Sequence, residues 1–313
     1  MNMVKNWDKI KNRYAEFWAM ENHDRPILHV TAPKTNVDFS KAPPLPKNID
    51  DRWLDFENVV KRARFNLEST YFAAEGFPCF MPDLGPDIFG ALLGADLIFG
   101  ESTSWAHHAV TDWKNFNPTT LDRTNKWYKK IIQLTDMTAT DANGDYMVGM
   151  PDLHAGADAL VSLRGSQNLC LDLYDCPEDI MDLPVKMWPI MQEIYNELYD
   201  ITQKSVPGSS TWMPCYHPGK WYVTSCDFIA LVSSSIFDSI VLPELKLQAG
   251  FFDANIFHLD GPDALRHLDS LLALPNINAI QWVFGAGAPP ASQPVAGVAY
   301  KNPKCRQGST PAN

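Results

Sequence analysis

The sequence predicts an α/β protein of the TIM type, a (β/α)8 barrel, and the stretch from Trp221 to Gly287 carries the prediction. In this stretch an apolar run is followed by an amphipathic run three times, which is the alternation expected of a β/α protein. Each apolar run ends in polar or reactive side chains: Cys226 and Asp227, then His258 and Asp260, then Gln281 and Trp282. Because the carboxyl ends of barrel strands meet at one mouth, we expect these residues to surround a single site.

The rest of the chain favours a closed barrel over an open sheet. Apolar and amphipathic segments alternate along it, and neither a glycine-rich dinucleotide-binding fingerprint nor a phosphate-binding loop marks a sheet crevice. With 313 residues the chain is long enough for one large barrel. We therefore expect a single domain over 1–313, with an N-terminal helical extension over roughly 1–50.

Charge and cysteine content argue against several classes of protein. The formal net charge is -11 and no run of lysine or arginine occurs, which disfavours nucleic acid or an anionic membrane as a partner. The six cysteines form neither a dense disulfide pattern nor a CxxC metal pair. No segment has the pattern of a targeting sequence or reaches the ~20 apolar residues of a membrane span. These features predict a cytoplasmic protein that acts on a small molecule.

The N-terminal region begins with a helix and a short strand. Apolar residues recur at spacings of three and four from Trp7 to Met20, so this segment is expected to form a helix that closes the barrel floor or joins a homodimer contact. Pro26–Pro33 is a strand candidate bounded by prolines, and a proline-rich loop follows it. The segment 51–75 has the pattern of a helix with one apolar face.

The middle of the chain continues the alternation. The segment 77–94 predicts a short strand, a turn and a helix of small residues, and 96–110 is a further strand candidate. The segment 177–204 has a helical pattern with interruptions at Pro184 and Pro189.

Three polar side chains of this middle region lie at predicted strand ends. Asp83 is at the turn after one strand, and Asp152 and His154 lie where a later strand opens into a helix. Carboxylate and imidazole groups at a barrel mouth can move protons, so Asp83 and His154 are candidate catalytic residues, and Asp152 is a candidate substrate contact.

His258 and Asp260 are two residues apart at a predicted strand end, so both side chains can point into the barrel mouth. This arrangement suits a pair of metal ligands or an acid/base pair. A hydrogen-bonding histidine of the core is the alternative interpretation of His258. Cys215 and His217 form a separate C-x-H half-site in a segment flanked by prolines, and they are further candidate ligands.

Cys226 and Asp227 are consecutive, so only one of them can point into the barrel. Asp227 is the candidate for the polar mouth and for catalysis, because an unpaired carboxylate buried against the helix layer is costly. Cys226 is then expected to be a packed, inert thiol.

Large aromatic side chains lie near three predicted strand ends. Trp212, Trp221 and Trp282 can wall a flat apolar pocket, with Gln281 as a polar substrate contact beside it. The alternative is that these rings simply fill the core.

The same segments carry a resemblance to a known superfamily. SCDF with PEL after it, HLDG-P and QWV-GAG resemble the uroporphyrinogen decarboxylase superfamily, which includes the corrinoid-linked methyltransferases. The likeness extends back through PDLHAGADALVSLRGSQNLCLDLYDCPE to about Pro82. It implies a (β/α)8 barrel that moves a one-carbon group between a small methylated compound and a corrinoid protein or thiol. The alternatives are a cofactor-free decarboxylase of a porphyrinogen and a non-catalytic binding barrel.

The resemblance also bears on the cofactor. In the corrinoid-linked methyltransferases the place of His258 and Asp260 looks like a His-x-Cys zinc motif, so zinc is the implied cofactor, with an oxygen ligand in the thiolate position. In the decarboxylase interpretation Asp83 or Asp227 holds the pyrrole N–H groups. Family members with that activity carry an arginine-rich motif near the N-terminus, whereas ENHDRPILHVTAP has one arginine, Arg25. This difference favours the methyltransferase branch.

The tail from Gln293 departs from the family pattern. QPVAGVAYKNPKCRQGSTPAN has no helical or strand period, although relatives continue here with a helix and the last strand. Read one base downstream, with suitable codons, it becomes SPWLEWLIKIQSAGKGVHQL, which is an amphipathic helix followed by an AGK-type turn that resembles the family. We therefore expect that residues 293–313 are out of frame and that the barrel lacks its last strand and helix.

Overall fold

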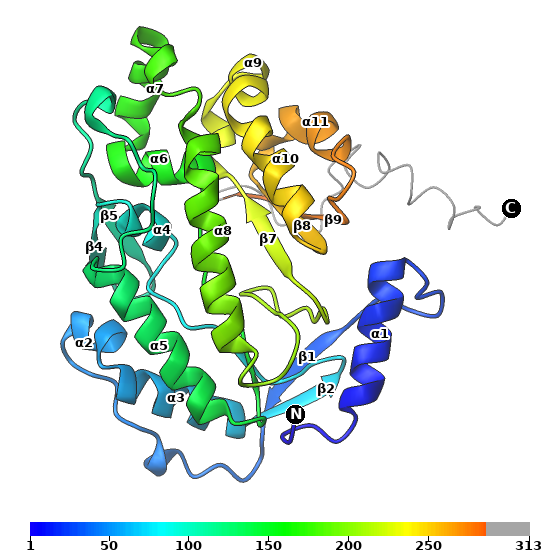
Figure 1. The fold of residues 1–313 in the computed structure, drawn as a ribbon. Coiled ribbons are helices and arrows are strands. Elements are labelled where there is room, and N and C mark those ends of the chain that lie inside the picture. Colours follow the sequence, from blue (N-terminus) through cyan, green and yellow to red (C-terminus); the bar gives the residue numbers. More distant parts are fainter. Residues whose placement is uncertain (286–313) are drawn as a thin grey trace, which may run out of the picture.

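The computed structural model describes residues 1–285, in which helices and short strands mix (Figure 1). The helices are α1 (Trp7–Ala19), α2 (Ile49–Leu54), α3 (Phe56–Glu68), α4 (Ile88–Leu92), α5 (Lys126–Ala142), α6 (Gly156–Arg164), α7 (Ser166–Asp175), α8 (Leu183–Thr202), α9 (Ser234–Ile236), α10 (Leu242–Phe251) and α11 (Leu268–Leu272). The strands are β1 (His29–Pro33), β2 (Thr70–Ala74), β3 (Cys79–Phe80), β4 (Asp96–Phe99), β5 (Ser104–His107), β6 (Met147–Val148), β7 (Trp221–Ser225), β8 (Ala254–Asp260) and β9 (Ala279–Val283). The predicted α/β class is confirmed. The tail 293–313, for which we expect a frame error, lies outside the described residues.

The largest sheet is parallel and has the order β7-β8-β9. Its register places Ser225 opposite His258, and His258 opposite Gln281. Helix α10 lies between β7 and β8 in the chain, and α11 lies between β8 and β9. The three strands are the apolar runs whose alternation predicted β/α units. Because they are parallel, their carboxyl ends bring the polar side chains to one edge.

The remaining strands of the described residues form separate pairs and do not close a ring of eight. β3 pairs with β6 in parallel, whereas β1–β2 and β4–β5 are antiparallel hairpins. β3 and β6 have 2 residues each, and Pro82 and Pro151 follow them, where proline cannot donate a ladder hydrogen bond. A backbone bond from Met150 N to Ser210 O (2.8 Å) continues from β6 toward the segment before β7. The described residues therefore show a parallel sheet within an α/β fold but no closed barrel.

Two segments of the N-terminal half differ from the sequence prediction. The helix predicted over 51–75 ends with α3, and β2 follows, because its threonine, tyrosine and phenylalanine favour a strand that pairs with β1. The strand predicted over 96–110 is a hairpin of β4 and β5, in which Gly100 N donates to Thr103 O (2.8 Å) at the turn.

Helix α8 is continuous where the sequence predicts interruptions. Pro184 lies in its first turn, where the missing N–H has no intrahelical partner to lose. Pro189 lies inside the helix, which continues to Thr202. Most of the buried residues of α8 are large and apolar, and their packing outweighs the hydrogen bond that Pro189 removes.

The two faces of the parallel sheet are buried against different partners. On one face Tyr222 and Phe257 belong to the main core, together with side chains of the helices. On the other face Trp221 and Ile256 pack near the start of the strands with Trp18 of α1. Helix α1 therefore covers the amino-terminal end of the sheet and leaves the carboxyl end for the site.

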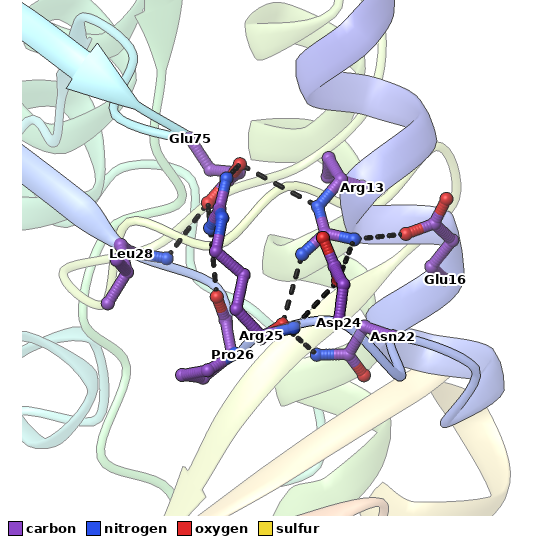
Figure 2. Close-up of polar contacts among 8 residues, drawn as sticks. All are labelled: Arg13, Glu16, Asn22, Asp24, Arg25, Pro26, Leu28 and Glu75. Atoms are coloured by element: carbon purple, nitrogen blue, oxygen red, sulfur yellow. Dashed lines mark hydrogen bonds and ion pairs between the residues drawn. The ribbon is translucent and has the colours of Figure 1, made fainter.

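A buried carboxylate, Glu75, ties α1 to the β1–β2 hairpin (Figure 2). Its side chain is 3% exposed and accepts hydrogen bonds from both terminal nitrogens of Arg25 (2.7 and 2.5 Å) and from Leu28 N (3.0 Å). Arg13 of α1 lies beside it (Nε to Oε1, 3.7 Å) and also binds Asp24 (2.8 Å). The hydrogen bonds from Arg25 lower the pKa of Glu75, so the cluster holds a carboxylate at neutral pH.

Candidate metal centre and active site

Asp227, His258 and Asp260 come together at the carboxyl ends of β7 and β8. Asp227 opens the helical turn that follows β7, and His258 and Asp260 are alternate residues of β8 that point to the same face. One ligand atom of each residue lies within 4.8 Å of the other two. His258 Nε2 is 4.0 Å from Asp227 Oδ1. The structure thus brings together three of the residues that strand-end placement predicted to converge, Asp227, His258 and Asp260.

The donor atoms of this cluster fit a divalent cation. His258 Nδ1 is 2.6 Å from Gln281 Oε1, so Nδ1 donates to the amide oxygen and Nε2 is left for a ligand. Among the described residues Asp260 Oδ1 is buried without a hydrogen-bond partner, and a buried carboxylate oxygen is costly unless a donor or cation neutralises it. One imidazole and two carboxylates are ligands that zinc accepts, and three protein ligands leave coordination positions open, as in catalytic zinc sites.

His154 lies between two carboxylates beside this cluster. Its Nε2 is 3.2 Å from Asp152 Oδ2, and its Nδ1 is 3.6 Å from Asp158 Oδ2. Burial by itself lowers the pKa of His154, but the attraction and hydrogen bond of Asp152, followed by the charges of Asp158 and Asp227, together raise it to about 10. His154 is therefore a cation at neutral pH.

Asp158 links the His154 pair to the turn after β7. Its carboxylate accepts hydrogen bonds from Asp227 N (2.9 Å) and Phe228 N (3.0 Å), and Cys226 Sγ lies 3.5 Å from Oδ1. The backbone of Asp227 is thereby fixed against α6. Sequence analysis missed Asp158, although its spacing of four residues from His154 at a predicted helix start was an available signal.

Asp83 and Asp227 have carboxyl groups that hold protons more tightly than usual. Burial raises the pKa of Asp83 to about 6, against the lowering effect of a hydrogen bond from Gly85 N (2.6 Å). Burial, followed by repulsion from Asp158, also raises the pKa of Asp227. His154 acts in the opposite direction on both groups. Asp83 and Asp227, whose raised pKa values suit proton exchange, thus both lie within the electrostatic influence of the His154 imidazolium.

The three tryptophans expected to wall a pocket lie in different surroundings. Trp212 packs edge-on against His258 (5.4 Å between ring centroids) and lines a cavity of about 330 Å³. Trp221 is fully buried at the other end of β7, and its indole N–H donates to backbone carbonyls. Trp282 alternates with Gln281 along β9, so it faces the main core. Trp212 therefore lies at the site, whereas Trp221 and Trp282 are core residues, which corrects the expectation for those two.

In the part of the chain that the structure describes, the separate half-site of Cys215 and His217 joins no group of three or more potential metal ligands. Within residues 1–285, Asp227, His258 and Asp260 form the one group of three or more potential ligands with suitable spacing. Burial raises the pKa of Cys215 to about 12, and His217 Nδ1 accepts a hydrogen bond from Gly219 N (3.0 Å). Cys215 is thus a buried, protonated thiol, and Nδ1 of His217 is occupied by a hydrogen bond from the backbone.

Glu244 of α10 is a buried acid that sequence analysis did not identify. Gln248 donates to both of its carboxylate oxygens (2.8 and 2.9 Å). Burial raises the pKa of Glu244 to about 8, and Asp158 contributes in the same direction. A Cβ at Gly156, whose φ is +64°, would lie 2.8 Å from Glu244 Oε2, so the start of α6 requires glycine. No pattern in the sequence marks Glu244 as buried.

Comparison of the chain with protein-family models gives no match, and a search of curated proteins finds no similar sequence. Among the described residues, no helix combines the length and the apolar character needed to cross a bilayer.

Proposed function

We propose that this chain is a metal-dependent enzyme that transfers a one-carbon group between a small methylated compound and a corrinoid protein or thiol. The fold that we propose is the (β/α)8 barrel of the uroporphyrinogen decarboxylase superfamily, in its methyltransferase-like branch. The parallel sheet β7-β8-β9 supports this proposal, because its carboxyl edge carries the candidate site, as in barrel enzymes.

The observation that carries the proposal is the convergence of Asp227, His258 and Asp260, with Gln281 orienting the imidazole. Zinc is the proposed cation, and when bound it would supply a Lewis acid that polarises the small substrate. Asp260 offers oxygen where the zinc motif of the methyltransferases has a thiolate. This harder ligand is less suited to thiol activation, so a corrinoid protein is the better-matched acceptor.

The neighbouring residues would control charge and protons. His154, held as a cation by Asp152 and Asp158, would stabilise negative charge that develops beside Asp227. Asp83 can give or accept a proton near pH 6. Trp212 would provide an apolar wall for a methyl-bearing substrate.

The rival functions have less support. Decarboxylation of a porphyrinogen needs cationic groups for many carboxylates, and Arg25 in the relevant N-terminal region is bound to Glu75. A non-catalytic barrel needs no perturbed acids, whereas raised pKa values gather at Asp83, His154 and Asp227.

The proposal is tested by zinc-dependent methyl transfer. The protein is stripped with a chelator, reloaded with zinc and mixed with cob(I)alamin and a panel of methylated amines, alcohols and thiols, and methylcobalamin formation is followed by absorbance. We expect turnover with at least one donor and a loss of about 100-fold or more in Asp227→Asn. Asp263→Asn, an exposed carboxylate paired with Arg266, is the matched control and should retain activity. Zinc-independent release of carbon dioxide from uroporphyrinogen, or full activity in Asp227→Asn, would contradict the proposal.

A further inference from the structure

A second cavity lies between α2, α3 and β3. Its volume is about 380 Å³, and two arginines, Arg52 of α2 and Arg62 of α3, line it together with Asn66 and Cys79. Both arginine side chains are partly buried. The cavity is therefore bordered by two positive charges in a protein whose formal net charge is -11.

Among the described residues, these two arginines lack the close carboxylate that the other arginines have. Elsewhere in residues 1–285 each arginine has a carboxylate oxygen within 3.5 Å: Arg13, Arg25, Arg64, Arg123, Arg164 and Arg266. Within residues 1–285 the carboxylate paired with Arg52 is that of Glu101, at 3.8 Å, and the Glu101 side chain is 79% exposed. Arg62 has no ion pair within the described residues.

One loop holds both guanidinium groups. Arg52 Nε donates to Pro46 O (2.9 Å), and Arg62 Nη1 donates to Pro43 O (2.8 Å). Each contact uses one N–H group of a guanidinium that has five, so the others are left without a protein acceptor among the described residues. An anion bound between two like charges beside one loop would offset their mutual repulsion. Planar guanidinium groups bind carboxylate and phosphate with paired hydrogen bonds.

This cavity adjoins the one beside the candidate metal centre. Asn66, Leu67 and Cys79 line both cavities, and the cavity of about 330 Å³ is also lined by Trp212, which packs against His258. The positive charges thus lie at the far end of two neighbouring cavities.

We propose that Arg52 and Arg62 form a binding site for the carboxylate or phosphate group of a small organic ligand. The site takes an oxyanion between the two guanidinium groups, and the rest of the ligand extends past Asn66 and Cys79 toward Trp212. Anion binding here does not depend on the proposed metal chemistry, because no residue of the metal cluster lines this cavity.

Titration calorimetry on the metal-free protein tests the site, with inorganic phosphate and succinate as probes at low ionic strength. We expect saturable binding of at least one probe with a dissociation constant of about 1 mM or tighter. Arg62→Gln and Arg52→Gln should each weaken it about 10-fold or more, and Arg62→Lys should weaken it less, because lysine keeps the charge but loses the paired hydrogen bonds. The preferred probe distinguishes a phosphate from a carboxylate ligand.

The matched control is Arg266→Gln, which removes the same charge from a surface pair with Asp263 and should bind the probes normally. Thermal unfolding of every variant checks that it is folded, and Arg62→Lys decides the outcome if Arg62→Gln does not fold. Absence of saturable binding below about 20 mM for both probes would overturn the proposal. Equal weakening in Arg266→Gln would do so as well, because it would show a general effect of net charge.

Discussion

At the scale of single residues, His258 is the side chain for which the metal-ligand and core interpretations predict different outcomes. Its side chain is 16% exposed, and Asp227 and Gln281 face its two ring nitrogens. We expect His258→Ala to lose bound zinc while its free energy of unfolding, measured in chelator, changes by no more than about 1 kcal/mol. His23→Ala, at an exposed position, is the control. Unchanged zinc content with a loss of several kcal/mol would instead identify a core histidine.

Gln281 acts on the cluster through His258. Its amide oxygen fixes the imidazole so that Nε2 faces Asp227. Gln281→Leu keeps the three ligands and a similar volume but removes this acceptor, so zinc affinity should fall by about 10- to 100-fold. Competition with a zinc chelator measures the affinity. Wild-type affinity in Gln281→Leu would show that the hydrogen bond does not orient the ligand.

The raised pKa of Glu244 leads us to expect that the free energy of unfolding depends on pH in a specific way. This pKa rises from an ordinary value of about 4.3 to about 8 in the folded protein. Between these values the folded state holds a proton that the unfolded state has released, so stability falls as pH rises. Glu244→Gln should remove a decline on the order of 3 kcal/mol between about pH 5 and about pH 9.

Urea unfolding of wild type and Glu244→Gln across this pH range measures the difference. The variant should be more stable than the wild type at the alkaline end and close to it at the acidic end, because glutamine resembles the neutral acid. Parallel pH profiles for the two proteins would show that Glu244 is ionised in the folded state.

At the scale of elements, α1 is held to the β1–β2 hairpin by Glu75. Glu75→Gln leaves Arg13 and Arg25 without this charge, and Arg13 Nε is already buried with no hydrogen bond to any described residue. We expect a loss of about 2–4 kcal/mol in unfolding free energy, below the range for a fully buried pair because Arg25 is 38% exposed. Glu57→Gln, in an exposed pair with Lys61, should cost under about 0.5 kcal/mol. Equal small losses would show that the cluster does not anchor α1.

The elements that the sequence predicted well are those with long, uniform patterns. The apolar runs of β7, β8 and β9 are separated by helical segments, and strand alternation then sets which of His258, Leu259 and Asp260 face the site. Prediction was poorer where local patterns compete. The turn at Gly100–Thr103 divides one apolar run into β4 and β5, and an aromatic run ends the helix before β2.

The candidate site was predictable to the extent that it lies at strand ends. Asp227, His258 and Asp260 follow from that rule, whereas Trp221 was misplaced because it begins β7 instead of ending it. Burial and charge partners depend on tertiary contacts. For that reason the role of Asp158 in fixing the turn after β7 was visible only in the structure.

At the scale of the whole molecule, the packing contacts with α1 and the candidate metal ligands lie at opposite ends of the parallel sheet. Helix α1 covers the amino-terminal end of the parallel sheet, and the carboxyl ends carry Asp227, His258 and Asp260. The segments between these ends are core, so a change at the carboxyl edge is expected to alter ligand binding more than folding.

The central claim is that one divalent cation is bound by Asp227, His258 and Asp260. Anomalous diffraction at the zinc edge, from crystals of the zinc-loaded full chain, tests it most directly. The account predicts a single strong peak about 2.0–2.2 Å from His258 Nε2 and from a carboxylate oxygen of each aspartate. A zinc-saturated crystal with no peak between these side chains, or with its strongest peak at other residues, would contradict the account.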